Sequence, residues 1–342
     1  MKYNKALEHC VFYFFNENEN TSKKQKIHKI VRFDFLIQNE LTNQKKLLNM
    51  CNKKTHFYLC ENTSELKITE IDENDRRFRS NYSKADNTIL LEFEDRNLIY
   101  LKNYLKALSP SKKYISTIIH FYKHILCSLQ LLVNHNIYHN HINFESIVVD
   151  KNDYPLLSNF SFSIDYLRAD IDQYIKRFIV EYDPSYIEWP IELHLLSYLL
   201  TNKLNSLSSY NIDNIIHEVT QNNQILNTFG PAIVSSYKEE ATDYFKKYVN
   251  QSYEYILTDI LQYSSTWDNY ALSILFLRIL IGIHRSINIK NKFIILFMKL
   301  LVCNIHLNPL KRNSLTSSTE QFEILLDNLD PKDYKEVINA LS

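Results

Sequence analysis

Three histidines lie close together in the stretch HNIYHNHINFESIVVD, which covers residues 135–150. They are His135, His139 and His141. An imidazole that titrates near neutral pH is suited to general-base catalysis, and its nitrogens also bind zinc. The spacing of the three residues matches no standard zinc pattern and no cysteine lies near them, so we expect no metal site here. His141 is a candidate general base, but a base has little to act on unless a metal ion and its carboxylate ligands accompany it.

The composition excludes several classes of phosphate-binding site. Gly230 and Gly282 are the only glycines in the chain, whereas an average chain of this length holds roughly 24. A loop that binds phosphate through backbone amides needs glycine, because a Cβ atom blocks the close approach of the phosphate. Glycine-rich phosphate loops are therefore excluded. Basic and acidic residues balance at 39 each, which favours neither a nucleic-acid nor a membrane partner.

The cysteines and the longest apolar stretch point to an intracellular protein. The five cysteines are scattered and show no C-x-x-C spacing, which is typical of free thiols in a reducing compartment. No secretory signal is recognisable. The stretch over 269–284 is too short to span a bilayer and contains Arg278, so we expect a buried helix there.

Short strands and longer helices are expected to position these groups. Alternating or apolar runs rich in β-branched and aromatic residues predict strands, and helical spacing of apolar residues predicts helices. The predicted strands cover 10–15, 26–33, 56–61 and 88–94, with a hairpin turn over 17–24 and a polar loop over 74–87. The predicted helices cover 36–51 and 116–136, and several more follow residue 193. The sequence therefore predicts an α+β chain with a β-rich first part and a helical second part.

Five short motifs follow one another in a recognisable order. They are HNHINFES (139–146), NFS (159–161), WPIE (189–192), TWDNYALSILFLRIL (266–280) and LNPLKRNSL (307–315). This order and spacing resemble those of protein kinases, in which H-R-D-L-x-x-x-N, D-F-G and A-P-E succeed one another. The resemblance extends over about residues 88–325 and is weaker over 1–87.

The resemblance implies a two-lobed protein-kinase-like fold. A small β-rich N-lobe would cover 1–95 and lack the glycine-rich loop, and a large helical C-lobe would cover 96–342. A helical insertion of about 70 residues, over 194–265, either thickens the C-lobe or offers a surface to a partner. WPIELHLLSYLL followed by such an insertion is similar to the kinase-like proteins of large nucleocytoplasmic DNA viruses, the giant viruses.

The structural residues of the family are present. Glu192 and Arg312 match a buried ion pair of the helical lobe, and loss of one member of such a pair leaves an unpaired charge. Asp268 matches the helix-start aspartate that accepts hydrogen bonds from the catalytic-loop backbone. His139 and Phe160 match two members of an apolar column that links the lobes.

The catalytic residues of the family are replaced. The family's catalytic base is an aspartate, and His141 stands in its place, while Asn143 replaces the loop lysine. Ser146 replaces the asparagine that holds one Mg²⁺ ion, and Asn159 replaces the D-F-G aspartate that holds Mg²⁺. Phosphoryl transfer consists almost wholly of positioning and charge neutralisation, so each replacement removes a direct contribution. The resemblance therefore implies a degenerate active site.

The nucleotide-binding part of the N-lobe is open to more than one interpretation. Lys29 is either the strand lysine that contacts phosphates or an ordinary surface lysine. Its helix partner is either Glu40 or Gln44. The segment Glu92–Phe93–Glu94 is either the hinge that binds adenine through its backbone or an ordinary strand end.

Three functions are compatible with these features. In the first, the protein is a pseudokinase without cofactor that binds another protein, such as an active kinase or a virion protein, in the host cytoplasm or the virion. In the second, it is a serine/threonine protein kinase with divergent catalytic residues that uses Mg-ATP, with Asp165 as a displaced carboxylate. In the third, it is a structural protein whose nucleotide cleft is filled.

Overall fold

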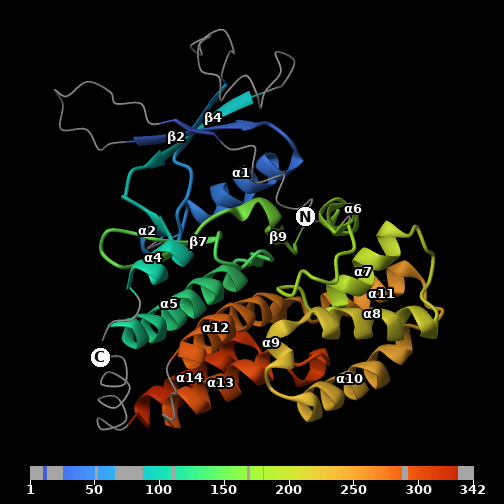
Figure 1. Cartoon of the computed structure of the whole chain (residues 1–342). Coiled ribbons are helices and arrows are strands. Elements are labelled where there is room, and N and C mark those ends of the chain that lie inside the picture. Colours follow the sequence, from blue (N-terminus) through green and yellow to red (C-terminus); the bar gives the residue numbers. More distant parts are fainter. Residues whose placement is uncertain are drawn as a thin grey trace, which may run out of the picture. The chain divides into compact units, whose positions relative to one another are not determined.

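The computed structural model describes residues 11–13, 26–50, 53–65, 88–108, 113–167, 170–179, 181–286 and 292–329. Small antiparallel sheets and many helices make up these residues, so the predicted α+β class is confirmed. Contacts divide the described chain into two compact units (Figure 1). Unit 1 holds the chain up to Leu101 together with Ile147–Ser163, and unit 2 holds Lys102–Ser146 and the chain from Ile164 onward.

Unit 1 contains an antiparallel sheet with the strand order β1-β2-β4-β3. The strands are β1 (Val11–Tyr13), β2 (Lys26–Arg32), β4 (Thr88–Glu94) and β3 (Asn62–Glu65). In the β2–β4 pair Lys29 lies opposite Leu91. The strands predicted over 26–33 and 88–94 are confirmed, and β1 occupies part of the strand predicted over 10–15. The predicted turn over 17–24 and the predicted loop over 74–87 lie outside the described residues.

The strand predicted over 56–61 is wrong. Residues Lys53–His56 form the short helix α2, and β3 begins only at Asn62. The alternating burial of the segment resembles that of a strand, but its backbone amides have no common neighbouring strand. The Tyr58 N–H donates to the Leu157 carbonyl, the Cys60 N–H to the Gln44 side chain, and the Glu61 N–H to the Glu92 carbonyl.

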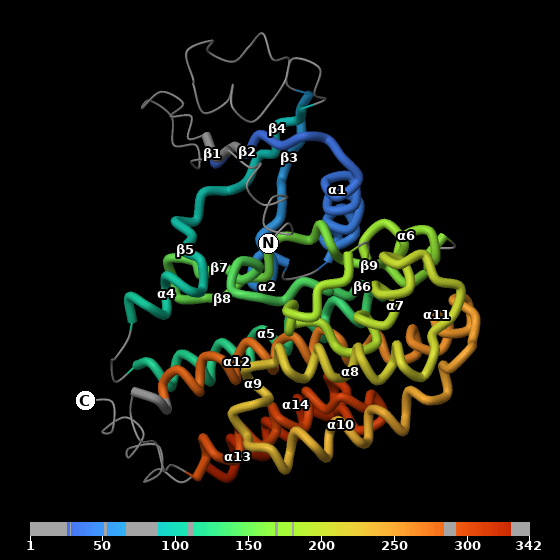
Figure 2. Tube along the Cα trace, turned by 45° about the vertical axis from the view of Figure 1, so that its right-hand side comes forward, coloured from blue at the N-terminus to red at the C-terminus, as the bar shows by residue number. Residues whose placement is uncertain are grey.

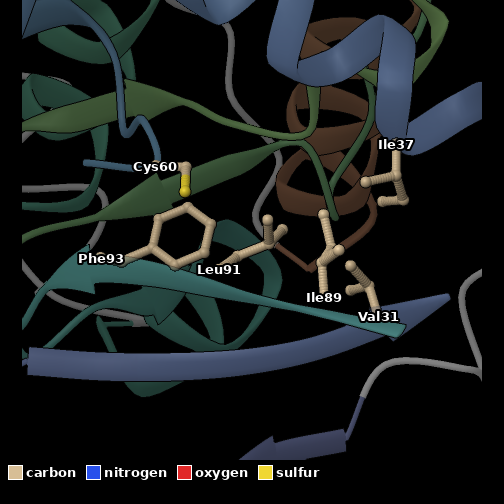
Figure 3. Packing of buried hydrophobic residues seen from close by; sticks show 6 residues of the cluster. All are labelled: Val31, Ile37, Cys60, Ile89, Leu91 and Phe93. Carbon is tan, nitrogen blue, oxygen red and sulfur yellow. The ribbon is translucent and has the colours of Figure 1, made fainter. Parts of the chain in front are cut away.

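Helix α1 (Phe35–Leu47) packs one face on this sheet. Asp34 caps its N-terminus, because its side chain accepts a hydrogen bond of 3.0 Å from the Ile37 N–H. Figure 3 shows the core beneath the helix, in which Ile37 of α1 lies over Val31, Ile89 and Leu91 of the sheet. The helix predicted over 36–51 is confirmed, although it ends at Leu47.

A second small sheet in unit 1 supports the NFS motif. Its order is β5-β7-β8, from β5 (Ile99–Tyr100), β7 (Ile147–Val149) and β8 (Pro155–Leu157). The short 3-10 helix η3 (Phe160–Phe162) follows β8 and contacts α1. The two sheets and η3 thus bring Lys29, α1 and the NFS motif into one unit.

Unit 2 is helical apart from the pair of short strands β6 (Ile137–Tyr138) and β9 (Ile164–Asp165). Its long helices include α5 (Tyr114–Asn134), α12 (Trp267–Ser286), α13 (Lys292–Asn304) and α14 (Leu315–Asp327), while α4 (Leu101–Leu108) begins at the unit boundary. Tyr122 of α5 is fully buried and packs edge-on against Phe276, Phe297 and Phe322, with ring centroids 4.7–5.0 Å apart. The helix predicted over 116–136 is therefore confirmed as a core helix.

The apolar stretch at the start of α12 has the length and hydropathy of a membrane span. The stretch is Ser264–Ile283, and 83% of it is buried inside the structure, as in the core helix of a globular unit. The buried helix predicted over 269–284 agrees with this arrangement, but the expectation that the stretch is too short to span a bilayer is wrong, because the apolar stretch begins at Ser264.

The predicted insertion over 194–265 is helical. Its helices are α7 (Ile191–Thr201), α8 (Ser209–Asn222), α9 (Gln224–Asn227), α10 (Pro231–Phe245), η4 (Lys246–Tyr248), α11 (Tyr253–Leu261) and η5 (Ser264–Thr266), preceded by α6 (Ile171–Phe178). Helix α8 lies between α7 and α10 and contacts both (Figure 2). Gly230 precedes α10 with φ +92°, and Pro231 occupies the first helical position.

The described cysteines Cys60, Cys127 and Cys303 are free thiols. Cys10 and Cys51 lie outside the described residues.

Candidate functional site

Asp268, in the first turn of α12, holds the backbone of the loop over 139–146. Its carboxylate accepts hydrogen bonds from the His139 N–H at 2.6 Å and from the Asn140 N–H at 2.7 Å. The side chain is buried, and this burial raises the pKa of Asp268 to about 6, although the two backbone donors oppose the rise. The backbone-acceptor contact expected of Asp268 is therefore confirmed. His139, which these bonds position, is fully buried in unit 2.

The imidazole of His141 is bonded at both nitrogens. Its Nδ1 lies 2.9 Å from the Tyr186 hydroxyl, and its Nε2 lies 3.1 Å from Asn143 Nδ2. Asn143 Oδ1 accepts the N–H groups of Glu145 and Ser146, so the NH₂ group of this amide points at His141. Nε2 then accepts a hydrogen bond. Nδ1 carries the imidazole proton and donates a hydrogen bond to the Tyr186 hydroxyl oxygen.

Burial keeps His141 neutral. The side chain is 6% exposed, and loss of solvation lowers the pKa of His141 to about 4. A second proton would have to occupy Nε2, where it would meet the NH₂ group of Asn143. His141 is therefore an uncharged imidazole at neutral pH, and its basic nitrogen is already engaged.

Ser146 closes the loop instead of presenting a metal ligand. Its hydroxyl accepts the Asn143 N–H at 2.9 Å and donates to the Asn143 carbonyl at 3.1 Å. The residue is fully buried. Asn143 thus bonds both His141 and Ser146, and His141 also bonds Tyr186, all within unit 2.

Lys29, Glu40 and the NFS motif form a second group, in unit 1. Burial raises the pKa of Glu40, whereas the positive charge of Lys29, the Phe160 N–H and the Ser161 hydroxyl lower it. Glu40 is therefore the carboxylate on which the Lys29 charge acts. Gln44, the other candidate partner, donates to Glu40 Oε1 at 2.9 Å and accepts the Cys60 N–H at 2.7 Å.

The NFS motif adopts a bent backbone. Asn159 is left-handed, with φ 60° and ψ 70°, a conformation that asparagine tolerates better than most residues. Its Oδ1 accepts a hydrogen bond from the Ser161 hydroxyl. Phe160 is fully buried, and its ring packs edge-on against Phe57 with centroids 5.9 Å apart. Phe160 is thus a core residue of unit 1.

The segment Glu92–Phe93–Glu94 forms the end of strand β4. It pairs with β2, and the Glu92 carbonyl also accepts the Glu61 N–H at 2.7 Å. The Glu94 side chain forms ion pairs with Lys54 and Arg96.

The ion pair expected between Glu192 and Arg312 is present. Glu192 lies in the first turn of α7, and Arg312 follows the 3-10 helix η6 (Pro309–Lys311). Arg312 Nη2 donates to Glu192 Oε1, and neither side chain is exposed to solvent. The guanidinium also lies over the Tyr270 ring, 5.7 Å from its centroid. The predicted contact between Glu192 and Arg312 is therefore observed.

Carboxylates are scarce where the motifs would place metal ligands. Across the described parts of the chain, no three His, Cys, Asp or Glu side chains come close enough together to hold a metal ion. Asp165, the candidate displaced carboxylate, is buried and accepts the Leu167 N–H at 3.2 Å. This carboxylate therefore contributes to a local turn.

Sequence reasoning missed three residues that shape these groups. Tyr186 bonds His141, but no local pattern distinguishes it from other tyrosines. Asn39 and Asn43 are buried on α1 and bond the NFS segment. Two asparagines four residues apart in a predicted helix put polar amides on one face, and that spacing was the available signal.

No protein-family model matches the chain, and no curated protein matches it. The resemblance to protein kinases therefore depends on the motifs and on the contacts that those motifs make.

Proposed function

We propose that this protein is a catalytically inactive member of the kinase-like proteins, a pseudokinase of viral type, with a small N-lobe and a large helical C-lobe. The observation that supports this most strongly is the loop over 139–146. In this loop Asn143 forms hydrogen bonds with His141 and Ser146, and His141 also forms one with Tyr186. The contacts of Asp268 and of the Glu192–Arg312 pair, which have structural and not catalytic roles, are retained.

The loss of metal ligands argues against phosphoryl transfer. Transfer needs Mg²⁺ to bridge the phosphates, and Mg²⁺ prefers anionic oxygen ligands. The two positions that correspond to metal ligands hold the neutral residues Ser146 and Asn159. The Ser146 hydroxyl is already bonded to the Asn143 backbone.

The remaining positive charge is too small for Mg-ATP. ATP brings about four negative charges, which kinases offset with Mg²⁺, a strand lysine and the amides of a glycine-rich loop. In this chain only Lys29 corresponds to these groups. We therefore propose that the protein has no nucleotide cofactor.

Function by protein binding is supported by the helical insertion. Tyr210 on α8 and Tyr255 on α11 are 76% and 49% exposed, and exposed aromatic side chains are favoured at protein interfaces. The proposed partner is a protein, such as another kinase or a virion protein, in the host cytoplasm or the virion. Nucleic acid and membrane are not proposed partners, because the charge of the chain is balanced.

The test is a titration of ATP with and without Mg²⁺, followed by thermal shift, beside a radiolabelled phosphate-transfer assay. We expect no Mg²⁺-dependent rise in melting temperature and no labelled product. His141→Ala is the matched variant for the transfer assay. Labelled product that disappears in His141→Ala, or clear Mg²⁺-dependent stabilisation, would instead favour an active serine/threonine protein kinase with divergent catalytic residues.

A further inference from the structure

One face of α1 carries four polar side chains that are almost completely buried. Asn39, Glu40, Asn43 and Gln44 are 3%, 5%, 0% and 2% exposed. Residues four apart in a helix lie on the same face, so these four form two adjacent pairs. A helix that packs on a protein core normally presents apolar residues at such positions. The polar face therefore needs bonding partners in the structure.

The two asparagines bond the backbone on both sides of Phe162 in η3. Asn39 Nδ2 donates to the Ser161 carbonyl at 2.8 Å and to the Ser163 carbonyl at 2.9 Å. Asn43 Nδ2 donates to the same Ser163 carbonyl at 2.9 Å and to Asn39 Oδ1 at 3.0 Å. These bonds satisfy two backbone carbonyls that the short η3 helix leaves without helical partners.

Glu40 and Gln44 extend the network in both directions. The Glu40 carboxylate accepts the Gln44 amide at 2.9 Å, and the Phe160 N–H and the Ser161 hydroxyl lower its pKa. Gln44 in turn accepts the Cys60 N–H. Buried side chains of α1 thus bond the NFS segment through Asn39 and Asn43, and the segment that precedes β3 through Gln44.

Such a network resists partial opening. If α1 moved away from η3, several buried donors and acceptors would lose their partners together, and each buried group left unpaired is unfavourable. Small displacements are therefore penalised as strongly as large ones. In protein kinases the position of the corresponding helix controls activity.

We propose that Asn39 and Asn43 form a lock that holds the NFS segment and α1 in a single arrangement, so that unit 1 does not switch. The proposal rests on the proposed function, since a binding protein gains affinity from a preorganised surface and loses nothing when a catalytic switch disappears. The lock consists of side chains of α1 bonded to backbone carbonyl groups, and it needs neither a metal ion nor a nucleotide.

The test is amide hydrogen exchange measured by mass spectrometry on the full chain without nucleotide. In the unmodified protein, the peptide covering 158–165 is expected to exchange as slowly as the peptide covering β4, because both open only with unit 1 as a whole. Fast exchange over 158–165 beside a protected β4 would overturn the lock. This measurement needs no variant, so a folding failure cannot obscure it.

The matched variants are the double substitution Asn39→Ala with Asn43→Ala, and Thr42→Ala as a control. Thr42 is exposed on the same helix and bonds only its own helix backbone, through the Gln38 carbonyl at 2.8 Å. We expect the double variant to accelerate exchange over 158–165 by about tenfold or more, since several buried hydrogen bonds are lost together. Thr42→Ala should leave that exchange unchanged. Equal exchange in the double variant and the control would overturn the lock.

The exchange result is independent of the transfer assay. A rapidly exchanging NFS segment without phosphate transfer would overturn the lock and leave the proposed function intact. A protected NFS segment with phosphate transfer would overturn the proposed function and leave the lock intact.

Discussion

Two buried ionisable side chains support the loop over 139–146, and they differ in charge: His141 is neutral and Asp268 is negative. Burial disfavours the charged form of each, so the pKa of His141 falls to about 4 and that of Asp268 rises to about 6. At pH 7 His141 is therefore neutral and Asp268 is ionised. The ionised carboxylate accepts the N–H groups of His139 and Asn140, whereas the neutral imidazole both accepts and donates.

Substitution of Asp268 should destabilise the protein. Asp268→Ala leaves the His139 and Asn140 N–H groups buried without an acceptor, so we expect the free energy of unfolding to fall by a few kcal/mol, at about 1–3 kcal/mol per unpaired donor. Denaturant titration of the two proteins measures this difference. Equal midpoints would contradict the role assigned to Asp268.

The same residue gives a pH dependence with a defined sign. Its pKa is higher in the folded state than the ordinary value of 3.8, so its contribution to stability is complete below pH 3.8 and is lost as pH rises through about 6. Relative to Asp268→Asn, which does not titrate, the wild type should lose about 2 kcal/mol between pH 4 and pH 7. A difference that stays constant across this range would contradict the assignment.

At the scale of elements, asparagine takes positions that glycine usually occupies. Seven described residues other than glycine have positive φ, and five of them are asparagines: Asn97, Asn136, Asn140, Asn159 and Asn250. Asparagine and glycine both reach the left-handed region at low cost. A chain with two glycines can thus still end helices and form tight loops.

The use of asparagine in place of glycine can be tested at Asn136, which follows the end of α5. The residue is exposed, has φ 59°, and donates its N–H to the Val133 carbonyl at 2.9 Å, as in a helix C-terminal turn. We expect Asn136→Ala to lower the free energy of unfolding by about 1 kcal/mol, because alanine is strained at this φ. Asn136→Gly should be at least as stable as the wild type. Thermal melts of the three proteins measure the order, and an alanine variant as stable as the glycine variant would contradict it.

At the scale of the whole molecule, the Glu192–Arg312 pair connects parts of unit 2 that lie 120 residues apart in the chain. Arg312→Met leaves the Glu192 carboxylate buried without its partner, and we expect a loss of about 3–5 kcal/mol. The double substitution Glu192→Leu with Arg312→Met removes both charges and should cost less than either single change. Chemical denaturation of the four proteins completes the cycle. Additive losses would show that the pair does not interact.

The sequence by itself determined the α+β class, the strands over 26–33 and 88–94, the main helices and the partners Glu192–Arg312 and Asp268. Local periodicity sets such helices and strands. The order of the motifs predicted which residues far apart in the sequence come into contact. The alternating pattern over 56–61 misled, because burial there comes from contacts with three separate segments and not from strand pairing.

Only the tertiary structure decided how the polar residues are used. It gave His141 two partners through Tyr186 and Asn143, selected Glu40 as the carboxylate near the Lys29 charge, and joined α1 to η3 through Asn39 and Asn43. The physical reason is that a hydrogen bond depends on direction and on distances of about 3 Å between atoms. Sequence spacing carries that information within one helix or turn, but not between segments that only folding brings together.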